Sequence, residues 1–206
     1  MKTGFKTRFA LVATAFIFAA NFASALAPTT KWSLDPSHSN VKFTVDYLVI
    51  SEVDGHFSKV DATMQNTKED FSDAKATVTI DANSISTDNE KRDGHLKSGD
   101  FFDTAKYPTI TFVSTSFKKV KGNKYKITGN LTMRGVTKTI AMDGQHLGNK
   151  KDGYGNMRSF WKTSFAVDRQ QYGVSWKSST PAGEAVVGDE VRMNINAQFV
   201  MQKENL

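Results

Sequence analysis

Apolar and polar residues alternate with a period of two along most of this chain, and this pattern constrains its fold more than any other feature. Val41, Phe43 and Val45, for example, alternate with Lys42 and Thr44. The same alternation recurs in four later stretches, 75–81, 109–112, 125–128 and 191–199. Because successive side chains of a strand point to opposite faces, each stretch predicts a strand with one buried and one solvated face.

Turn-forming residues separate these stretches. Gly122 and Asn123 predict a tight hairpin between the strands on either side of them. The segments 148–156 and 178–189, which contain glycine and proline residues, predict two longer loops. Hairpin spacing of this kind is typical of antiparallel sheets.

Only the segment 88–102 breaks the strand pattern. Asp88 is suited to cap a helix, and Gly94 and Gly99 keep that helix short. About eight strands and one short helical segment predict an all-β fold, an eight-stranded antiparallel barrel of lipocalin-like shape. A sandwich with a filled core is the alternative, because both folds present one apolar face inward.

The first 25 residues form a separate object. Lys2, Lys6 and Arg8 precede an apolar run from residue 9 to residue 20, and Ala23-Ser24-Ala25 supplies a cleavage signal. The apolar run is too short to cross a hydrocarbon core of about 30 Å as a helix. We therefore predict a signal peptide over 1–25, with cleavage after Ala25, and one domain over 26–206.

Charge and cysteine content support a secreted, soluble protein. The chain carries 27 basic and 21 acidic residues; removing the three leader cations leaves 24 against 21, a net charge of +3 that requires no nucleic acid partner. The chain contains no cysteine, so a hydrophobic core must stabilise it without disulfides, and no lipid can be attached to an N-terminal cysteine. We expect it in the bacterial periplasm.

Signals of catalysis are weak. There is no thiol nucleophile, no glycine-rich phosphate loop and no serine elbow. The four histidines show none of the close spacings that mark a metal site. We therefore predict no metal site, no cofactor and no enzymatic activity.

Four polar residues permit two interpretations. His38, Asp93, His95 and Arg169 could form a polar rim that recognises a lipid headgroup. Alternatively they satisfy backbone groups, pin turns and cap the short helix, whose first N–H groups need partners. The second interpretation is favoured.

Eight motifs in a fixed order give the chain a resemblance. They occupy residues 35–39, 55–57, 84–87, 92–102, 107–108, 129–131, 135–138 and 168–169. With these motifs in combination, the chain resembles the YceI-like family of secreted bacterial lipid-binding proteins. The resemblance implies an eight-stranded periplasmic barrel that holds a polyisoprenoid chain, including that of a quinone, or another fatty-chain lipid.

The inward faces of the strands are the candidate site for such a lipid. Its tail needs only an apolar lining, because transfer from water contributes about 0.8 kcal/mol per methylene. The candidate lining residues are Val41, Phe43, Val45, Ile80, Phe112, Ile127, Leu131, Met142, Phe165, Ile195 and Phe199. Each of them is also an ordinary core residue, so the existence of a cavity rests mainly on the resemblance.

Three functions follow, in descending order of weight. The first is binding, sequestration or transport of an isoprenoid lipid, with transient membrane contact. The second is a stress-response or structural barrel that is closed and empty, and the third is an enzyme that uses His38, His95 or Asp93 on a lipid headgroup. An acid at Asp46, where the family often has histidine, favours a neutral headgroup over a phosphate. An exposed strand edge could support a homodimer.

Overall fold

The computed structural model describes residues 28–203. The predicted leader and its cleavage site lie outside the described residues. Within the described range the chain forms eleven strands, one α-helix and three short 3₁₀ turns. The strands are β1 (Thr30–Leu34), β2 (Asn40–Tyr47), β3 (Ser51–Phe57), β4 (Val60–Asn66), β5 (Lys75–Asp81), β6 (Ile85–Ser86), β7 (Thr109–Lys121), β8 (Lys124–Met133), β9 (Val136–Lys151), β10 (Met157–Asp168) and β11 (Val187–Met201). The helix is α1 (Glu90–Lys97), and the 3₁₀ turns are η1 (Pro36–His38), η2 (Ala82–Ser84) and η3 (Arg169–Tyr172).

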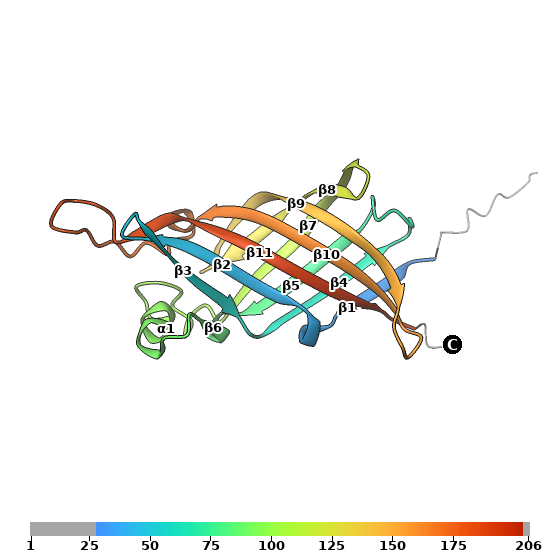
Figure 1. Cartoon of the computed structure of the whole chain (residues 1–206), viewed down its shortest axis with the longest axis horizontal. Coiled ribbons are helices and arrows are strands. Elements are labelled where there is room, and N and C mark those ends of the chain that lie inside the picture. Colours follow the sequence, from blue (N-terminus) through green and yellow to red (C-terminus); the bar gives the residue numbers. More distant parts are fainter. Residues whose placement is uncertain (1–27, 204–206) are drawn as a thin grey trace, which may run out of the picture.

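The strands close into an eight-stranded antiparallel barrel. Three pairs of consecutive strands, β1 with β2, β3 with β4 and β5 with β6, act as single long strands with an interruption, and β7 to β11 complete the set. β11 pairs along its length with both β2 and β1, as in the registers Ile195 with Val41 and Phe199 with Leu34, which closes the sheet on itself. The predicted barrel is confirmed, and the closure excludes the sandwich (Figure 1).

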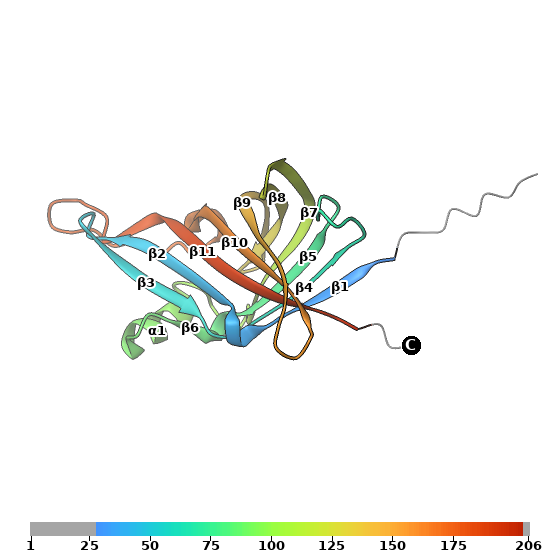
Figure 2. The ribbon, with the colours of Figure 1, turned by 45° about the vertical axis from the view of Figure 1, so that its right-hand side comes forward.

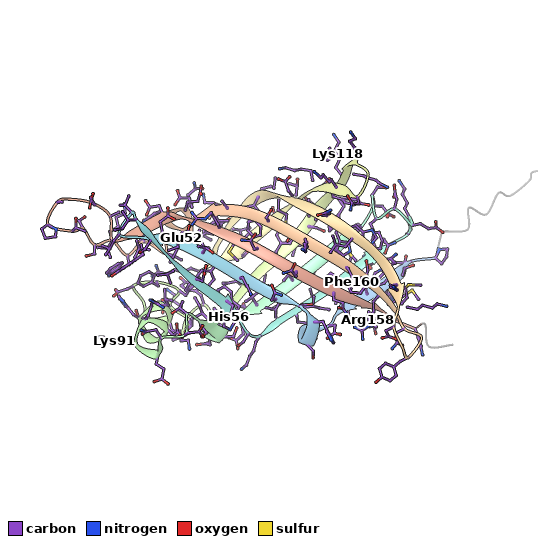
Figure 3. The ribbon with its side chains drawn as sticks, in the orientation of Figure 1. Glu52, His56, Lys91, Lys118, Arg158 and Phe160 are labelled. Carbon is purple, nitrogen blue, oxygen red and sulfur yellow. The ribbon has the colours of Figure 1, made fainter. Side chains whose placement is uncertain are left out.

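The interruption between β1 and β2 follows from the sequence Asp35-Pro36. Pro36 lacks an N–H and cannot continue the strand ladder. The Asp35 carboxylate accepts a hydrogen bond from the Ser37 N–H (3.0 Å), and the Ser39 hydroxyl donates to the Asp35 carbonyl (2.7 Å). Arg158 of β10, whose position Figure 3 labels, bridges the Asp35 and Asp152 carboxylates at 2.5 and 2.8 Å. Local hydrogen bonds therefore stabilise the break, and Arg158 anchors it to the β9–β10 hairpin.

The structure adjusts three local predictions. The helix is capped by Asn89, whose side chain accepts from the Arg92 N–H, and the prediction of Asp88 as cap was wrong by one residue. Asp88 has a left-handed φ of 59°, whereas a cap residue is extended, as Asn89 is. The Gly122-Asn123 hairpin is confirmed. β9 continues to Lys151, so the first predicted loop, 148–156, is shorter than expected. The second predicted loop, 178–189, instead spans 173–186, because η3 ends at Tyr172 and β11 starts at Val187.

The two ends of the barrel differ. The β2–β3 turn lies at one end, together with α1 and the segment 173–186, while β1 and the β9–β10 turn lie at the other (Figures 1 and 2). We call the first the mouth end and the second the plugged end. The candidate site described below lies between these two ends.

Candidate ligand-binding site

An apolar cavity of about 230 Å³ runs along the inside of the barrel. Inward-facing side chains of β2, β5, β7, β8, β9, β10 and β11 form most of its wall. All eleven residues predicted from the alternation lie on that wall: Val41, Phe43, Val45, Ile80, Phe112, Ile127, Leu131, Met142, Phe165, Ile195 and Phe199. Their contact with a lipid remains a prediction. This cavity means that side chains do not fill the barrel. The alternative function, a structural barrel without cargo, would require them to fill it.

Aromatic rings fill the plugged end. Phe71, on the loop between β4 and β5, is 1% exposed, and its ring centroid lies 5.8 Å from that of Trp32 and 5.3 Å from that of Trp161. His146 stacks on Trp161 at 4.7 Å. The Tyr125 hydroxyl donates to the Asp70 carbonyl at 2.6 Å, which ties the loop to β8. We call Trp32, Phe71, Tyr125, His146 and Trp161 the aromatic plug; the cavity stops at Trp161.

Burial shapes the chemistry of His146 within the plug. Its Nε2 lies 2.9 Å from the Asn149 side-chain oxygen and 3.2 Å from the Ser159 hydroxyl. Burial lowers the pKa of His146 below its usual value, because the apolar rings around the imidazole disfavour its charged form. The rings of the plug therefore favour the neutral form of this imidazole.

At the mouth end the cavity wall continues to Val45 and Val187. Leu96 of α1, with Phe101 and Phe102 just after it, forms part of the wall there. Trp176 stacks on Phe101 with centroids 5.4 Å apart. The cover at this end is therefore a helix and two loop segments, in contrast to the rings packed inside the strands at the plugged end.

Arg169 is the one charged side chain on the cavity wall within the described range, and its hydrogen bonds are fully used. Its Nε donates to the Gly188 carbonyl at 2.8 Å. Its Nη1 donates to the carbonyls of Val174 and Trp176 at 2.8 and 2.9 Å. Its Nη2 donates to the Val187 carbonyl at 3.3 Å and the Asp189 carboxylate at 3.1 Å.

A guanidinium has five N–H donors, and Arg169 has a protein partner for each. Burial lowers the pKa of Arg169, although a guanidinium stays charged, and the nearby Asp189 and Asp168 carboxylates oppose that shift. Arg169 thus holds the segment after η3 against the start of β11. A headgroup could bind this side chain only by displacing one of those partners.

The other three predicted rim residues do not line the cavity. The His38 Nδ1 lies 2.9 Å from the Asp35 carboxylate, on the outside of the β1–β2 break. Asp93 accepts from the backbone N–H and the hydroxyl of Thr87, at 2.8 and 2.6 Å. The His95 Nε2 lies 2.9 Å from the Asp100 carboxylate. These contacts fit the capping and pinning interpretation, and any contact with a headgroup stays a prediction.

Between residues 28 and 203, no helix is long and apolar enough to cross a membrane. In the same range, no group of three or more His, Asp or Glu side chains is arranged to hold a metal ion.

The comparison that identifies the family covers nearly the whole barrel. A family model described as the YceI-like domain matches residues 32–199. The chain belongs to the YceI-like family. A UPF0312 protein of Staphylococcus aureus (strain USA300) is 34% identical over 171 residues, which cover 82% of this chain and 97% of that protein. The family predicted from the motifs is thereby confirmed.

Solved structures share the YceI-like barrel. A YceI protein of Campylobacter jejuni is 30% identical, with a TM-score of 0.63 over 75% of this chain and 88% of its own. BcnA of Burkholderia cenocepacia has a TM-score of 0.69 at 23% identity, over 80% and 98% of the two chains. A polyisoprenoid binding domain from Saccharophagus degradans, implicated in plant cell wall breakdown, has a TM-score of 0.62 at 16% identity, over 83% and 98%. The last two show a likeness of fold.

Three inward-facing glycines, which the sequence reasoning missed, let side chains of neighbouring strands pack close to the wall of this YceI-like barrel and leave space inside it. A Cβ on Gly55 would lie 2.3 Å from the Phe43 ring, and one on Gly129 would lie 2.4 Å from the Phe112 ring. A Cβ on Gly144 would lie 2.6 Å from Ile127 Cδ1. These side chains rest against bare backbone on a neighbouring strand. The available signal was a glycine at an inward position of an alternating strand, which marks a close approach.

Thr163 is a further residue that the sequence reasoning missed. It lies on the cavity wall between the inward residues Trp161 and Phe165 of β10. The alternation alone would have identified it, since a threonine at an inward position is polar where its neighbours on the same face are apolar.

Proposed function

We propose that this protein binds a long-chain isoprenoid or related lipid in its barrel, and sequesters or carries it in the periplasm. The observation that carries the proposal is the apolar cavity of about 230 Å³ between the aromatic plug and the mouth end. Membership of the YceI-like family supports it. So does the shared fold of the polyisoprenoid binding domain from Saccharophagus degradans.

Binding in this proposal is driven by desolvation of the tail. Each methylene moved from water into an apolar surrounding contributes about 0.8 kcal/mol, so a chain of many methylenes binds without a specific hydrogen bond. The end of the tail lies against Trp161, and the polar head lies at the mouth end near Val45 and Val187. Thr163 offers a hydroxyl along the way to a polar atom of the ligand.

We infer a neutral headgroup, such as a quinone or an alcohol. A phosphate would need a cation with free N–H groups, and the five donors of Arg169 are all engaged. The proposed role is non-enzymatic. An acid–base mechanism at the headgroup needs two groups within reach of each other. His38, Asp93 and His95 instead pair with Asp35, Thr87 and Asp100.

A cavity-filling variant tests the proposal. Val78 of β5 lies on the cavity wall, whereas Val113, on the neighbouring strand β7, is 48% exposed on the outer face. Delipidated protein is mixed with a polyprenol or a polyprenyl quinone, and the bound fraction is counted by native mass spectrometry. We expect one lipid per chain in the wild type and in Val113→Phe, and at least tenfold weaker binding in Val78→Phe.

Two outcomes would contradict this function. Wild-type protein that is folded by circular dichroism but takes up neither lipid would overturn lipid binding itself. Equal uptake by Val78→Phe and Val113→Phe would place the lipid somewhere other than the cavity.

A further inference from the structure

The turn between β2 and β3 combines backbone strain with apolar exposure. Leu48 and Val49 have φ values of 51° and 66°, in the left-handed region that glycine and asparagine adopt readily. A β-branched residue such as Val49 is a marked outlier there. Hairpin turns with positive φ at successive residues normally carry Asn-Gly or a similar pair. The fold alone therefore gives no reason for leucine and valine at these positions.

The same turn is apolar and exposed. Ile50 is 92% exposed, Val49 65% and Tyr47 39%. Residues 46–54 contain no lysine or arginine. We call Tyr47–Ile50 the apolar turn. Strain and exposure at one place indicate that these side chains are kept for contact with something outside the barrel.

The apolar turn is connected to the end of the cavity. Val45, two residues before Tyr47, lies on the cavity wall. The Leu48 N–H donates to the Val186 carbonyl at 3.0 Å, and the next residue, Val187, also lies on the wall. The turn projects from the mouth end beside the segment 178–186, and Glu52 lies just beyond it on β3 (Figures 1 and 3).

We propose that the apolar turn inserts into the surface of a zwitterionic lipid bilayer and so brings the mouth end of the cavity against the membrane. This inference rests on the proposed function, for which a bilayer is the source or destination of the lipid. A stable protein interface buries about 800 Å² on each partner, which three side chains on a narrow turn do not supply. A bilayer needs no matching surface, and it accepts single apolar side chains with a tyrosine at the headgroup level.

The charges beside the turn select the kind of bilayer. Asp46 and Glu52 flank it, and the Arg192 guanidinium neutralises them in part, at 2.8 and 2.7 Å. Attraction to anionic lipid needs a cluster of lysine or arginine at the contact, and the apolar turn has none. Apolar insertion into phosphatidylcholine therefore suits this surface better than electrostatic attraction to phosphatidylglycerol.

The absence of cysteine makes a direct test possible. Ile50→Cys is labelled with an environment-sensitive nitrobenzoxadiazole dye and mixed with phosphatidylcholine vesicles. Tyr154→Cys, equally exposed at 92% on the β9–β10 turn of the plugged end, is the matched control. We expect a blue shift and at least a twofold rise in emission at position 50, and no change at position 154.

Four results would overturn the inference. The first is an unchanged emission at position 50 with vesicles, and the second is an equal change at both positions. The third is a change at position 50 that needs phosphatidylglycerol. The fourth is a change at position 50 that appears without vesicles as protein concentration rises, which would assign the turn to a second copy of the chain.

A transfer experiment separates this inference from lipid binding. Leu48→Asn/Val49→Gly/Ile50→Ser replaces the strained apolar turn with residues suited to its backbone. We expect lipid uptake from phosphatidylcholine vesicles to slow about tenfold, with unchanged binding of the same lipid from detergent solution. An unchanged rate from vesicles would overturn the role of the turn while leaving lipid binding intact. If the wild type bound no lipid from detergent solution, the proposed function would instead be overturned. The dye result would still report whether the turn contacts the bilayer.

Discussion

At the residue scale, the inward glycines carry a specific prediction. In Gly55→Ala, the new Cβ would lie within 2.9 Å of three atoms of the Phe43 ring, so the ring must move towards the cavity. We expect a destabilisation of about 1–3 kcal/mol, typical of overpacked cores, and weaker lipid binding. Urea unfolding and lipid uptake measure the two effects.

Gly94 of α1 is the matched control. A Cβ there meets nothing within 4 Å, so Gly94→Ala should stabilise the helix by roughly 0.5–1 kcal/mol and leave lipid binding unchanged. If Gly55→Ala were as stable as wild type and bound lipid equally well, the glycines would not be what makes room in the barrel.

Arg169 carries the second prediction at this scale. In Arg169→Lys, a single ammonium replaces a fork of five donors, and several carbonyls between Val174 and Gly188 lose their partner. We expect a loss of about 2–4 kcal/mol in the free energy of unfolding, since unpaired buried groups are costly. The relative affinities for a polyprenol and a polyprenyl phosphate, measured at low temperature without denaturant, should stay the same. A selective loss of phosphate binding would show that Arg169 contacts the headgroup.

The residue scale also shows what the sequence could and could not supply. The period of two assigned eleven side chains to the inner face, because a strand offers only two faces. It could not supply the size of the cavity, which depends on how Phe43 and Phe112 settle against Gly55 and Gly129. Nor could it show that the donors of Arg169 are engaged, because their acceptors lie up to twenty residues away on other segments.

At the scale of elements, the aromatic plug predicts a pH dependence. The folded-state pKa of His146 lies below its unfolded value of about 6.5, because burial disfavours the imidazolium. As pH falls below about 6.5 the unfolded chain takes up a proton before the folded chain does, so the free energy of unfolding decreases. The decrease ends once pH is below the folded pKa.

Urea unfolding of the wild type and His146→Gln between pH 8 and pH 5 measures this effect. We expect the wild type to lose more stability than the variant over that range. The pKa values of Asp35 and Asp152 are lowered by their hydrogen bonds to Arg158, that of Asp152 to about 2, so these carboxylates titrate below the range. Parallel pH profiles for the two proteins would contradict the lowered pKa of His146.

The elements that escaped prediction are the irregular ones. The plug depends on Phe71, which sits in a loop at a φ of 57° and is carried into the barrel end by tertiary packing. No local pattern indicates such a residue. The strand interruptions, by contrast, were readable in part, since Asp35-Pro36 cannot continue a strand ladder.

At the scale of the whole molecule, the two ends of the barrel are built differently. One end is filled by aromatic rings, and the other is covered by α1, loops and the apolar turn. A lipid held along this axis would have its tail against Trp161 and its head towards the apolar turn. This arrangement joins the proposed function and the bilayer contact in one account.

Lipid binding in the barrel is best tested by mass spectrometry of an organic extract from natively purified protein. We expect a stoichiometric isoprenoid or related lipid with a neutral head in the wild type and in Val113→Phe, and its loss in Val78→Phe. A well-folded wild type that yields no such lipid, and that also takes up no added polyprenyl lipid, would contradict it.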